Sequence, residues 1–410
     1  MAFLRDDLAQ LAAYQSPHPA SSHPASSHPA SFDPTSSHLA EHEHPESFDH
    51  KICLQPALDP LDTNESPIDL PQAVKAALAS QYEKAIAANR YPDGNPLALK
   101  QAIRQYAIHS GAIAAETISI HNITLGNGSD ELIRSVIMAT CLGGHGSILV
   151  APPTFSMYSI LANTLGVPVH SVGRNDQFEV DIAAAQTAID TADGPPIRVI
   201  FMVHPNSPTG NALTQREIDW LRQLPSDILV MVDEAYFEFS GQTTLADALS
   251  RPNWLITRTF SKAFRLAAHR VGYGIAHPSI ITALEKLRLP YNLPSFSQAA
   301  AQTALAHSEQ LLTQIPIILA ERHQLIQALS HHPYLQVWPS DSNFIYVRLS
   351  EHGLATLGVS EQAQGLSILF EQLKANGTLI RNTGGGLRIS IGTAAENQRT
   401  LANLQTGLPG

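Results

Sequence analysis

The most constraining feature of the chain is a regular alternation of short apolar runs with amphipathic stretches between residues 96 and 295. The apolar runs have the length and continuous character of strands that are buried on both faces, and they lie at 146–151, 167–172, 197–203, 228–232, 254–258 and 271–276. Stretches such as 96–110 and 129–142 have the period of a helix instead. Strands that alternate with helices predict a mostly parallel α/β sheet.

The C-terminal part of the chain has a different pattern. Residues 297–329 show long helical periodicity, and 343–348 and 387–391 have the character of strands. This mixture is typical of an α+β unit. We therefore predict a large domain over 86–295 and a smaller α+β domain assembled from residues 51–85 and 296–410.

The N-terminal region contains a repeat that does not have the pattern of a folded domain. Residues 1–14 resemble a short amphipathic arm that could dock elsewhere on the protein. Within residues 15–50 the motif His-Pro-Ala-Ser-Ser begins at His18 and His23 and recurs in part from His28. With few large apolar residues and many prolines, we expect a disordered insertion. Its histidines allow metal chelation or a pH-dependent charge, but the fixed period favours repeat expansion.

Composition excludes several classes of function. The net charge of the 410 residues is −11 and the basic residues form no runs, so neither nucleic acid nor an anionic membrane is expected as a partner. Cys53 and Cys141 offer no disulfide framework and no metal-ligand spacing, which fits a reducing compartment. No apolar run approaches the length of a membrane helix, and acidic residues stand where a signal peptide is basic. A cytoplasmic enzyme without a bound metal is the expectation.

Three loops that follow or precede predicted elements carry candidate binding residues. Gly128, Ser129 and Asp130 come directly before an amphipathic helix, where free backbone amides suit a phosphate group. A plain helix cap is the alternative. Phe155 follows a buried strand and can stack on a flat ring or serve packing alone. Asn206 lies in a turn rich in proline and offers a neutral amide donor.

An acid and a lysine complete the set of candidates. Asp233 ends a hydrophobic strand, where a carboxylate is costly unless it has a partner such as a protonated pyridine nitrogen or local amides. Tyr236 follows three residues later. Lys262 lies in a segment rich in hydroxyl groups, and such a lysine can carry pyridoxal phosphate as a Schiff base while Asp233 keeps a proton on the ring. In another context Lys262 would be an ordinary surface lysine.

A series of motifs in one order gives the chain a specific resemblance. The motifs occupy residues 62–67 (Asp-Thr-Asn-Glu-Ser-Pro), 90–94 (Arg-Tyr-Pro-Asp-Gly), 126–131, 153–155, 205–210, 232–239, 261–264 and 387–392. Over residues 52 to about 400 the chain resembles the pyridoxal phosphate-dependent class I/II aminotransferases, and within them the histidinol-phosphate aminotransferases. The resemblance implies the aspartate aminotransferase-like fold type I, whose large domain binds pyridoxal 5'-phosphate on a mostly parallel seven-stranded sheet.

The resemblance also implies a role for each candidate. Lys262, Asp233 and Tyr236 are the expected catalytic residues, with Lys262 moving the proton and Asp233 facing the pyridine nitrogen. Tyr236 and Asn206 are expected at the phenolate oxygen of the cofactor, and Phe155 on its ring. The expected phosphate-binding groups are those of Gly128, Ser129, Asp130, Thr259, Ser261 and Arg270.

Substrates and partners follow from the same resemblance. Arg388 is expected to receive the α-carboxylate of the amino donor, and Arg381 the substrate phosphate. Tyr91 is expected to reach the cofactor phosphate of a neighbouring subunit, which implies a homodimer with shared active sites. The expected reaction transfers an amino group between L-glutamate and imidazole-acetol phosphate, giving L-histidinol phosphate and 2-oxoglutarate in histidine biosynthesis.

Other functions remain open at this point. The same motifs fit an aminotransferase for aromatic or other amino acids, or a phosphoamino-acid decarboxylase, and a non-catalytic binder is a further alternative. Arg265 and Ala268 stand where relatives often have glycine, and Arg265 could alter anion selectivity or point to solvent. Phe155, where many relatives have tyrosine, keeps the stacking face without the hydroxyl group.

Overall fold

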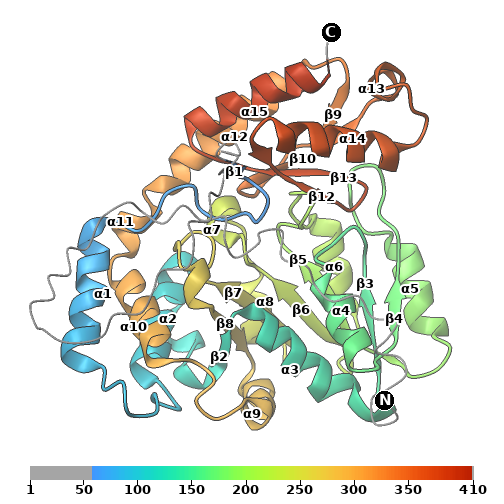
Figure 1. Cartoon of the computed structure of the whole chain (residues 1–410). Coiled ribbons are helices and arrows are strands. Elements are labelled where there is room, and N and C mark those ends of the chain that lie inside the picture. The colour runs from blue at the N-terminus through green and yellow to red at the C-terminus, as the bar shows by residue number, and fades with distance from the viewer. Residues whose placement is uncertain (1–57, 409–410) are drawn as a thin grey trace, which may run out of the picture.

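A seven-stranded sheet lies at the centre of the computed structural model, which describes residues 58–408 (Figure 1). In spatial order its strands are β2 (Ile123–Asn127), β8 (Val271–Ala276), β7 (Trp254–Thr259), β6 (Leu229–Asp233), β5 (Ile197–Val203), β3 (Ser147–Val150) and β4 (Val169–Ser171). β8 pairs antiparallel with β2 and β7, and the other pairs are parallel. The predicted mostly parallel sheet is confirmed.

Both faces of this sheet are covered by helices, which explains why its central strands are apolar on both faces. On β5, Val199 and Phe201 pack into one core and Ile200 and Met202 into the other. Helices α3 (Ser129–Cys141), α4 (Met157–Thr164) and α9 (Pro278–Leu287) supply the first core. The second core is supplied by helices that include α2 (Leu97–Ser110), α5 (Ile182–Thr191), α6 (Gln215–Gln223), α8 (Leu245–Ser250) and α10 (Ser295–Ala306).

The C-terminal part forms a second, smaller layer above the first in Figure 1. Its antiparallel sheet has the order β12 (Arg381–Thr383), β13 (Gly386–Ser390), β10 (Phe344–Leu349) and β9 (Leu335–Val337). Separately, β1 (Asp59–Pro60) pairs in parallel with β11 (Thr378–Leu379). The helices are α12 (Gln314–Ser330), α13 (Glu351–Thr356), α14 (Gln362–Ala375) and α15 (Ala394–Gly407). This part has its own apolar core.

The long helical pattern predicted over 297–329 corresponds to three helices. α10 is followed by the short α11 (Ser308–Leu312) and then by α12. Pro316 lies in the first turn of α12. Because proline has no N–H group, it is tolerated in the first turn of a helix but breaks a helix interior. The helical pattern predicted over 297–329 is therefore interrupted before α12, which begins as a new helix.

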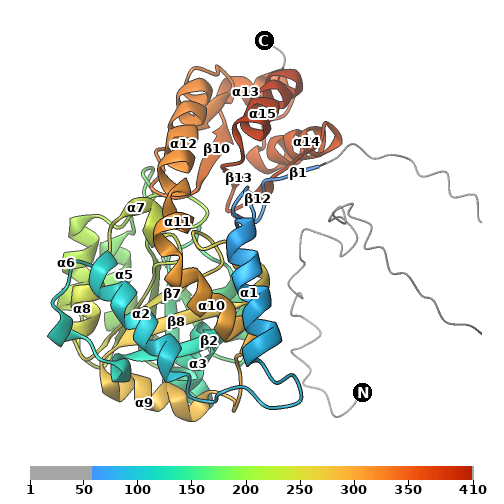
Figure 2. The same ribbon diagram turned by 90° about the vertical axis from the view of Figure 1, so that its left-hand side faces the viewer.

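The chain passes twice between the two layers. One passage runs from β1 to α1 (Gln72–Ala85), and the other runs through α11 (Figure 2). Val74 and Leu78 of α1 pack into the core of the large sheet, and α1 contacts α10, whereas Leu61 belongs to the core of the small sheet. The predicted domain boundaries at residues 85 and 295 stay predictions, and α1 itself packs on the side of the large sheet.

Several predictions fall outside residues 58–408, namely the N-terminal arm, the repeat over 15–50 and the context of Cys53. In the part of the chain that the structure describes, no helix combines the length and the apolar character that a membrane span requires.

Candidate active site

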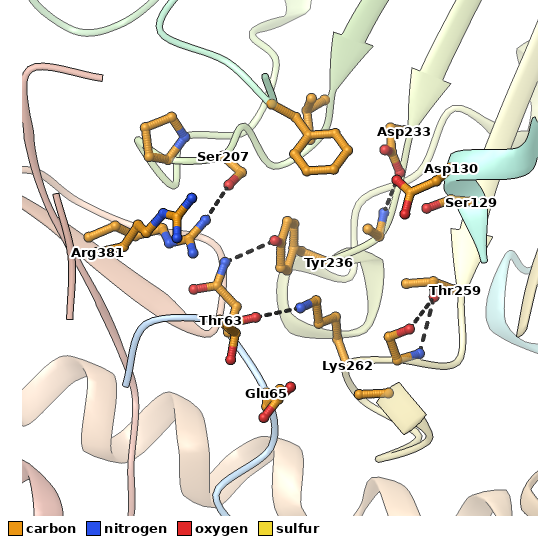
Figure 3. Close-up of a pocket in the computed structure, with 18 of the residues that line it drawn as sticks. Thr63, Glu65, Ser129, Asp130, Ser207, Asp233, Tyr236, Thr259, Lys262 and Arg381 are labelled. Carbon is orange, nitrogen blue, oxygen red and sulfur yellow. Dashed lines mark hydrogen bonds between the residues drawn. The ribbon is translucent and has the colours of Figure 1, made fainter. Parts of the chain in front are cut away.

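The parallel strands of the large sheet end at one common edge, and a cavity of about 490 Å³ opens there toward the small domain (Figure 3). β6 ends at Asp233 and β7 at Thr259. Because β8 runs in the opposite direction, Arg270 enters this edge just before β8 begins. The cavity is lined by most of the predicted site residues: Ser129, Asp130, Phe155, Asp233, Tyr236, Thr259, Ser261, Lys262, Arg270, Arg381 and Arg388.

One end of the cavity has the features of an anion site. Gly128 is the cap residue of α3 with a φ of 73°, and no side chain caps the helix. The alternative of a plain helix cap, in which a side chain would bond to the first amides of α3, is therefore not observed. A Cβ atom at Gly128 would lie 2.5 Å from Nη2 of Arg270, so a larger residue would push the guanidinium away from its place at the helix N-terminus. Arg270 also donates to Ser261 Oγ at 3.3 Å. Free amides, a cation and hydroxyl groups together suit a phosphate.

Asp233 lies in the wall of the cavity and is 3% exposed. Its carboxylate accepts hydrogen bonds from the Tyr158 hydroxyl at 3.0 Å and from the Ala235 N–H at 3.2 Å. Burial raises the pKa of Asp233 to about 6, although the hydrogen bond from Tyr158 opposes this rise. Tyr158 also contacts Phe155 edge to face at 5.5 Å. Sequence reasoning missed Tyr158, whose only signal was its place three residues after Phe155.

Lys262 extends from the loop after β7 into the same cavity. Its Nζ donates to the backbone carbonyl of Thr63 at 2.7 Å. Burial, together with the nearby positive charge of Arg388, lowers the pKa of Lys262 to about 8. An amine with this pKa is deprotonated in a substantial fraction of molecules near neutral pH, as a nucleophile or a base requires.

The two residues expected at a phenolate oxygen differ in their placement. Tyr236 lines the cavity, and its hydroxyl oxygen accepts a hydrogen bond from Asn64 Nδ2 at 2.9 Å. Asn206 is 1% exposed and is not among the lining residues. Its Nδ2 donates to the Pro153 carbonyl at 3.0 Å and to Thr209 Oγ1 at 2.6 Å, so both amide hydrogens have acceptors. The donor role predicted for Asn206 stays a prediction, which these contacts do not favour.

The far end of the cavity carries the two arginines predicted to bind substrate. Arg381 on β12 is the cross-strand partner of Arg388 on β13, so the hairpin brings the two cations together. Arg388 donates to Ser207 Oγ at 3.1 Å and to the Asp62 carbonyl at 2.5 Å. Like charges on directly opposite residues are unfavourable unless anions approach them. Their position at the cavity therefore fits anion binding.

Tyr91 and Arg265 lie outside the cavity. Tyr91 is 81% exposed and stacks on Tyr291 with 4.7 Å between the ring centroids, so its predicted role requires a second subunit. Arg265 donates to the backbone carbonyls of Asp69 at 3.0 Å and Leu311 at 2.9 Å. Arg265 therefore does not contact the anion site, and it does not simply point into solvent. Its side chain connects the two passages of the chain between the layers.

The residues present fit pyridoxal phosphate by their chemistry. An anion site lies at the N-terminus of α3, a buried carboxyl group lies on the wall, and a lysine of lowered pKa faces the space between them. Phe155 and Tyr236 offer aromatic side chains along the same space. Residues 62–64 also line it, although the sequence marked them only as part of a motif.

Comparison with known proteins agrees with this geometry. Residues 59–404 match the family model described as aminotransferase class I and II. A histidinol-phosphate aminotransferase of Trichodesmium erythraeum is 60% identical over 350 residues, which cover 85% of this chain and 92% of the relative. Histidinol-phosphate aminotransferase 2 of Nostoc sp. is 52% identical over 409 residues, covering 99% of this chain and 97% of that one.

Solved structures show the same fold. The histidinol-phosphate aminotransferase of Sinorhizobium meliloti, in complex with pyridoxal-5'-phosphate, superposes with a TM-score of 0.72 at 24% identity, covering 85% of this chain and 90% of that chain. A protein from Erwinia carotovora atroseptica, whose name as a histidinol-phosphate aminotransferase is provisional, superposes with a TM-score of 0.71 at 26% identity. The match covers 85% of this chain and 96% of that one. With the family model and the close relatives, these likenesses show that the chain belongs to the class I and II aminotransferases.

Proposed function

We propose that the protein is a histidinol-phosphate aminotransferase that uses pyridoxal 5'-phosphate. It transfers an amino group between L-glutamate and imidazole-acetol phosphate, giving L-histidinol phosphate and 2-oxoglutarate in histidine biosynthesis. The observation that carries the proposal is one cavity with Lys262 between two separate groups of anion-binding residues. Relatives named for this reaction are 50–60% identical over most of the chain, which supports the choice of substrate.

The residues that would hold the cofactor surround the anion site. Thr259, Ser261, Arg270 and the first amides of α3 would bind its phosphate, and Asp233 would face its pyridine nitrogen. When bound, pyridoxal phosphate supplies an electron sink for the carbon that bears the transferred nitrogen. A carboxylate held in a buried wall keeps a ring nitrogen protonated, because an unpaired buried charge is costly.

Lys262 would move the proton. Its lowered pKa, about 8, lets the amine accept a proton at neutral pH and return it. The Thr63 carbonyl holds Nζ at the centre of the cavity, which reduces the loss of side-chain freedom during that transfer. Donor and acceptor would use the cavity in turn, so the kinetics should be those of a ping-pong reaction.

Arg381 and Arg388 would select the substrate by its anionic groups. Guanidinium groups bind carboxylate and phosphate in a planar, bidentate manner. Hydrogen bonds to Ser207 and to the Asp62 carbonyl hold Arg388 in place at the cavity. Substrates that lack the matching anion would not form these hydrogen bonds and should therefore react more slowly.

We also propose a homodimer with shared active sites. Large apolar side chains are exposed around α1, α10 and the segment before α10, where Tyr82 contacts Phe296 and Tyr91 stacks on Tyr291. Leu289 in the same segment is 71% exposed. Several exposed apolar side chains on neighbouring segments favour burial against a partner. The cytoplasm is the proposed location, in which the free thiol of Cys141 is stable.

The test of the proposed function is a comparison of substrates with purified protein. We expect kcat/KM for histidinol phosphate, with 2-oxoglutarate as acceptor, to exceed that for phenylalanine by at least about a hundredfold, since its phosphate would pair with the half-buried Arg381. Threonine phosphate should release no carbon dioxide. Equal rates with phenylalanine would favour a broad-specificity aminotransferase, and decarboxylation would favour a phosphoamino-acid decarboxylase.

A pair of lysine variants tests the proposed catalytic residue. Lys262→Ala should lower kcat by at least about a hundredfold because it removes the general base. Lys374→Ala removes an exposed lysine of α14 and should leave kcat unchanged. If Lys262→Ala kept its turnover, the proposed mechanism would be wrong.

A further inference from the structure

Residues 62–64 run from β1 across the mouth of the cavity and hydrogen-bond to the predicted catalytic side chains. Figure 3 shows two of these contacts as dashed lines beside Thr63 and Tyr236. The Thr63 carbonyl accepts from Lys262 Nζ at 2.7 Å, and Asn64 Nδ2 donates to the Tyr236 hydroxyl oxygen at 2.9 Å. Two consecutive residues of the small domain thus contact two functional groups of the large domain.

The side chain of Asn64 has a defined orientation. Ser390 Oγ accepts the Asn64 backbone N–H at 2.9 Å and donates to Asn64 Oδ1 at 3.0 Å. With the Ser390 hydroxyl donating, the amide oxygen of Asn64 lies toward Ser390 and its NH₂ group toward Tyr236. Asn343 Nδ2 holds the Asn64 carbonyl at 3.1 Å. All three residues are at most 2% exposed.

The backbone of Asn64 suits asparagine. Its φ is 55°, in the left-handed region that asparagine and glycine adopt more readily than other residues. The side chain therefore reaches Tyr236 from a backbone conformation that restricts which residues can replace it.

The consequence concerns the proton of Tyr236. Asn64 donates to the Tyr236 oxygen, so the proton of that hydroxyl must point elsewhere, and none of residues 58–408 accepts it. The Tyr236 ring is held edge to face on Phe344 at 5.1 Å and lines the cavity. The direction left for the O–H group is the cavity itself.

We propose that Asn64 is a positioning residue that directs the Tyr236 proton into the cavity, where it can be donated to the phenolate oxygen of pyridoxal phosphate. Ser390 fixes the Asn64 amide in the orientation that this requires. The inference rests on the proposed function, because it assigns a direction to a hydrogen bond toward the cofactor of that function.

Two substitutions at Asn64 separate this role from a merely structural one. Asn64→Asp keeps the volume and the contact with Ser390, but its second oxygen accepts the Tyr236 proton and turns it away from the cavity. Asn64→Gly keeps the left-handed backbone and leaves the Tyr236 hydroxyl free to rotate. A structural role predicts that Asp is the milder change, whereas proton direction predicts that Asp is the more severe one.

Two readouts that do not depend on turnover measure the effect. The first is Kd for pyridoxal phosphate binding to cofactor-free protein, and the second is the pH midpoint of the visible absorbance of the bound cofactor. For Asn64→Asp we expect a Kd about tenfold higher and a midpoint about one pH unit higher, because a phenolate oxygen without a donor is more basic. Asn64→Gly should shift both less, and Ser390→Ala should shift them in the same direction.

The same substitution in a Tyr236→Phe background isolates the effect of the added negative charge. In Tyr236→Phe protein, Asn64→Asp can act only through its negative charge, so it should cause less than half of the shift that it causes in the wild type. An equal shift in both backgrounds would overturn the proposal, as would an Asn64→Asp effect no larger than that of Asn64→Gly.

A control separates this inference from the proposed function. Ser66→Ala alters the same segment where Ser66 Oγ contacts only Ile68 and no cavity residue, and it should bind the cofactor like the wild type. Wild-type protein and Ser66→Ala protein that failed to bind pyridoxal phosphate would overturn the proposed function and the inference together. Normal binding by both, with unaffected Asn64 variants, would overturn the inference alone.

Discussion

At the scale of single residues, Asp233 is a functional group that lowers the stability of the folded protein when it is ionised. Its carboxyl group ends an apolar strand, and burial raises its pKa from 3.8 to about 6. The folded protein therefore holds this proton more tightly than the unfolded chain does, and ionised Asp233 destabilises the cofactor-free protein. Tyr158 reduces the cost, because its hydroxyl donates to the carboxylate.

The pH dependence of stability follows with a definite sign. The contribution of Asp233 is fully present below its unfolded pKa and is lost as the pH rises through its folded pKa of about 6. In cofactor-free protein, Asp233→Asn has no such loss, so its stability advantage over the wild type should grow by about 1 kcal/mol between about pH 5 and about pH 7.5. Urea unfolding at both values measures it, and an advantage independent of pH would contradict the assignment.

Tyr158 offers the complementary variant. Tyr158→Phe removes the donor that stabilises the ionised carboxylate and should raise the pKa of Asp233 further. The pH range over which the cofactor-free protein loses stability should then extend to higher pH than in the wild type. An unchanged range would show that the Tyr158 hydroxyl does not stabilise the ionised carboxylate.

At the scale of elements, the loop after β7 connects Lys262 to both passages of the chain between the layers. Arg265, three residues after Lys262, has a φ of 60° and donates to the carbonyl of Asp69 before α1 and of Leu311 in α11. Glycine would adopt this backbone without strain. In this chain Arg265 has the strained backbone, but its side chain forms two hydrogen bonds, one to the segment before α1 and one to α11.

Two variants of Arg265 measure both effects. Arg265→Ala loses the hydrogen bonds and keeps the strained backbone, so the free energy of unfolding should fall by about 2 kcal/mol. Arg265→Gly loses the same bonds but relieves the strain, so it should recover about 1 kcal/mol of that fall. Urea unfolding gives both values. Because Arg265 does not line the cavity, KM for histidinol phosphate should stay within about twofold. A larger change would show that its charge acts on the substrate.

At the scale of the whole molecule, the proposed dimer depends on the exposed apolar side chains around α1 and α10. Leu289→Glu places a charge among them and should weaken the dimer at least about tenfold, because an unpaired buried charge is costly. Leu142→Glu is the matched control at the end of α3, at a leucine that is 41% exposed. Sedimentation velocity distinguishes the two variants. A Leu289→Glu protein as dimeric as the control would place the interface elsewhere.

Shared active sites predict complementation between two inactive subunits. Tyr91→Ala and Lys262→Ala each disable their own homodimer. A hybrid dimer combines the intact Lys262 of one subunit with the intact Tyr91 of the other at one site, so about half of the wild-type activity should return. Differently tagged subunits allow the hybrid to be purified and assayed. No recovery would show that Tyr91 acts within its own subunit or not at all.

Most strands of the large sheet and the main chemical groups could be predicted from the sequence. Strands such as β5 are buried on both faces, so their apolar runs were visible without any structure. Asp233 was visible because a carboxylate at the end of a buried strand is costly and needs a partner. Lys262 was visible because it lies in a segment rich in hydroxyl groups. β2 was missed as a strand: it contains Thr124 and Gly126 and lies at the edge of the sheet, where its pattern is weak.

The tertiary structure alone decided how these groups are held and directed. Asn64 and Ser390 are 326 positions apart in the chain, and Tyr158 and Asp233 are 75 apart, so no local pattern records that they touch. The two hydrogen bonds of Arg265 are likewise visible only in the folded structure, where its side chain reaches the segment before α1 and α11. Residue types and periodicity reveal local structure and costly groups, whereas the direction of a hydrogen bond depends on which distant segments folding brings together.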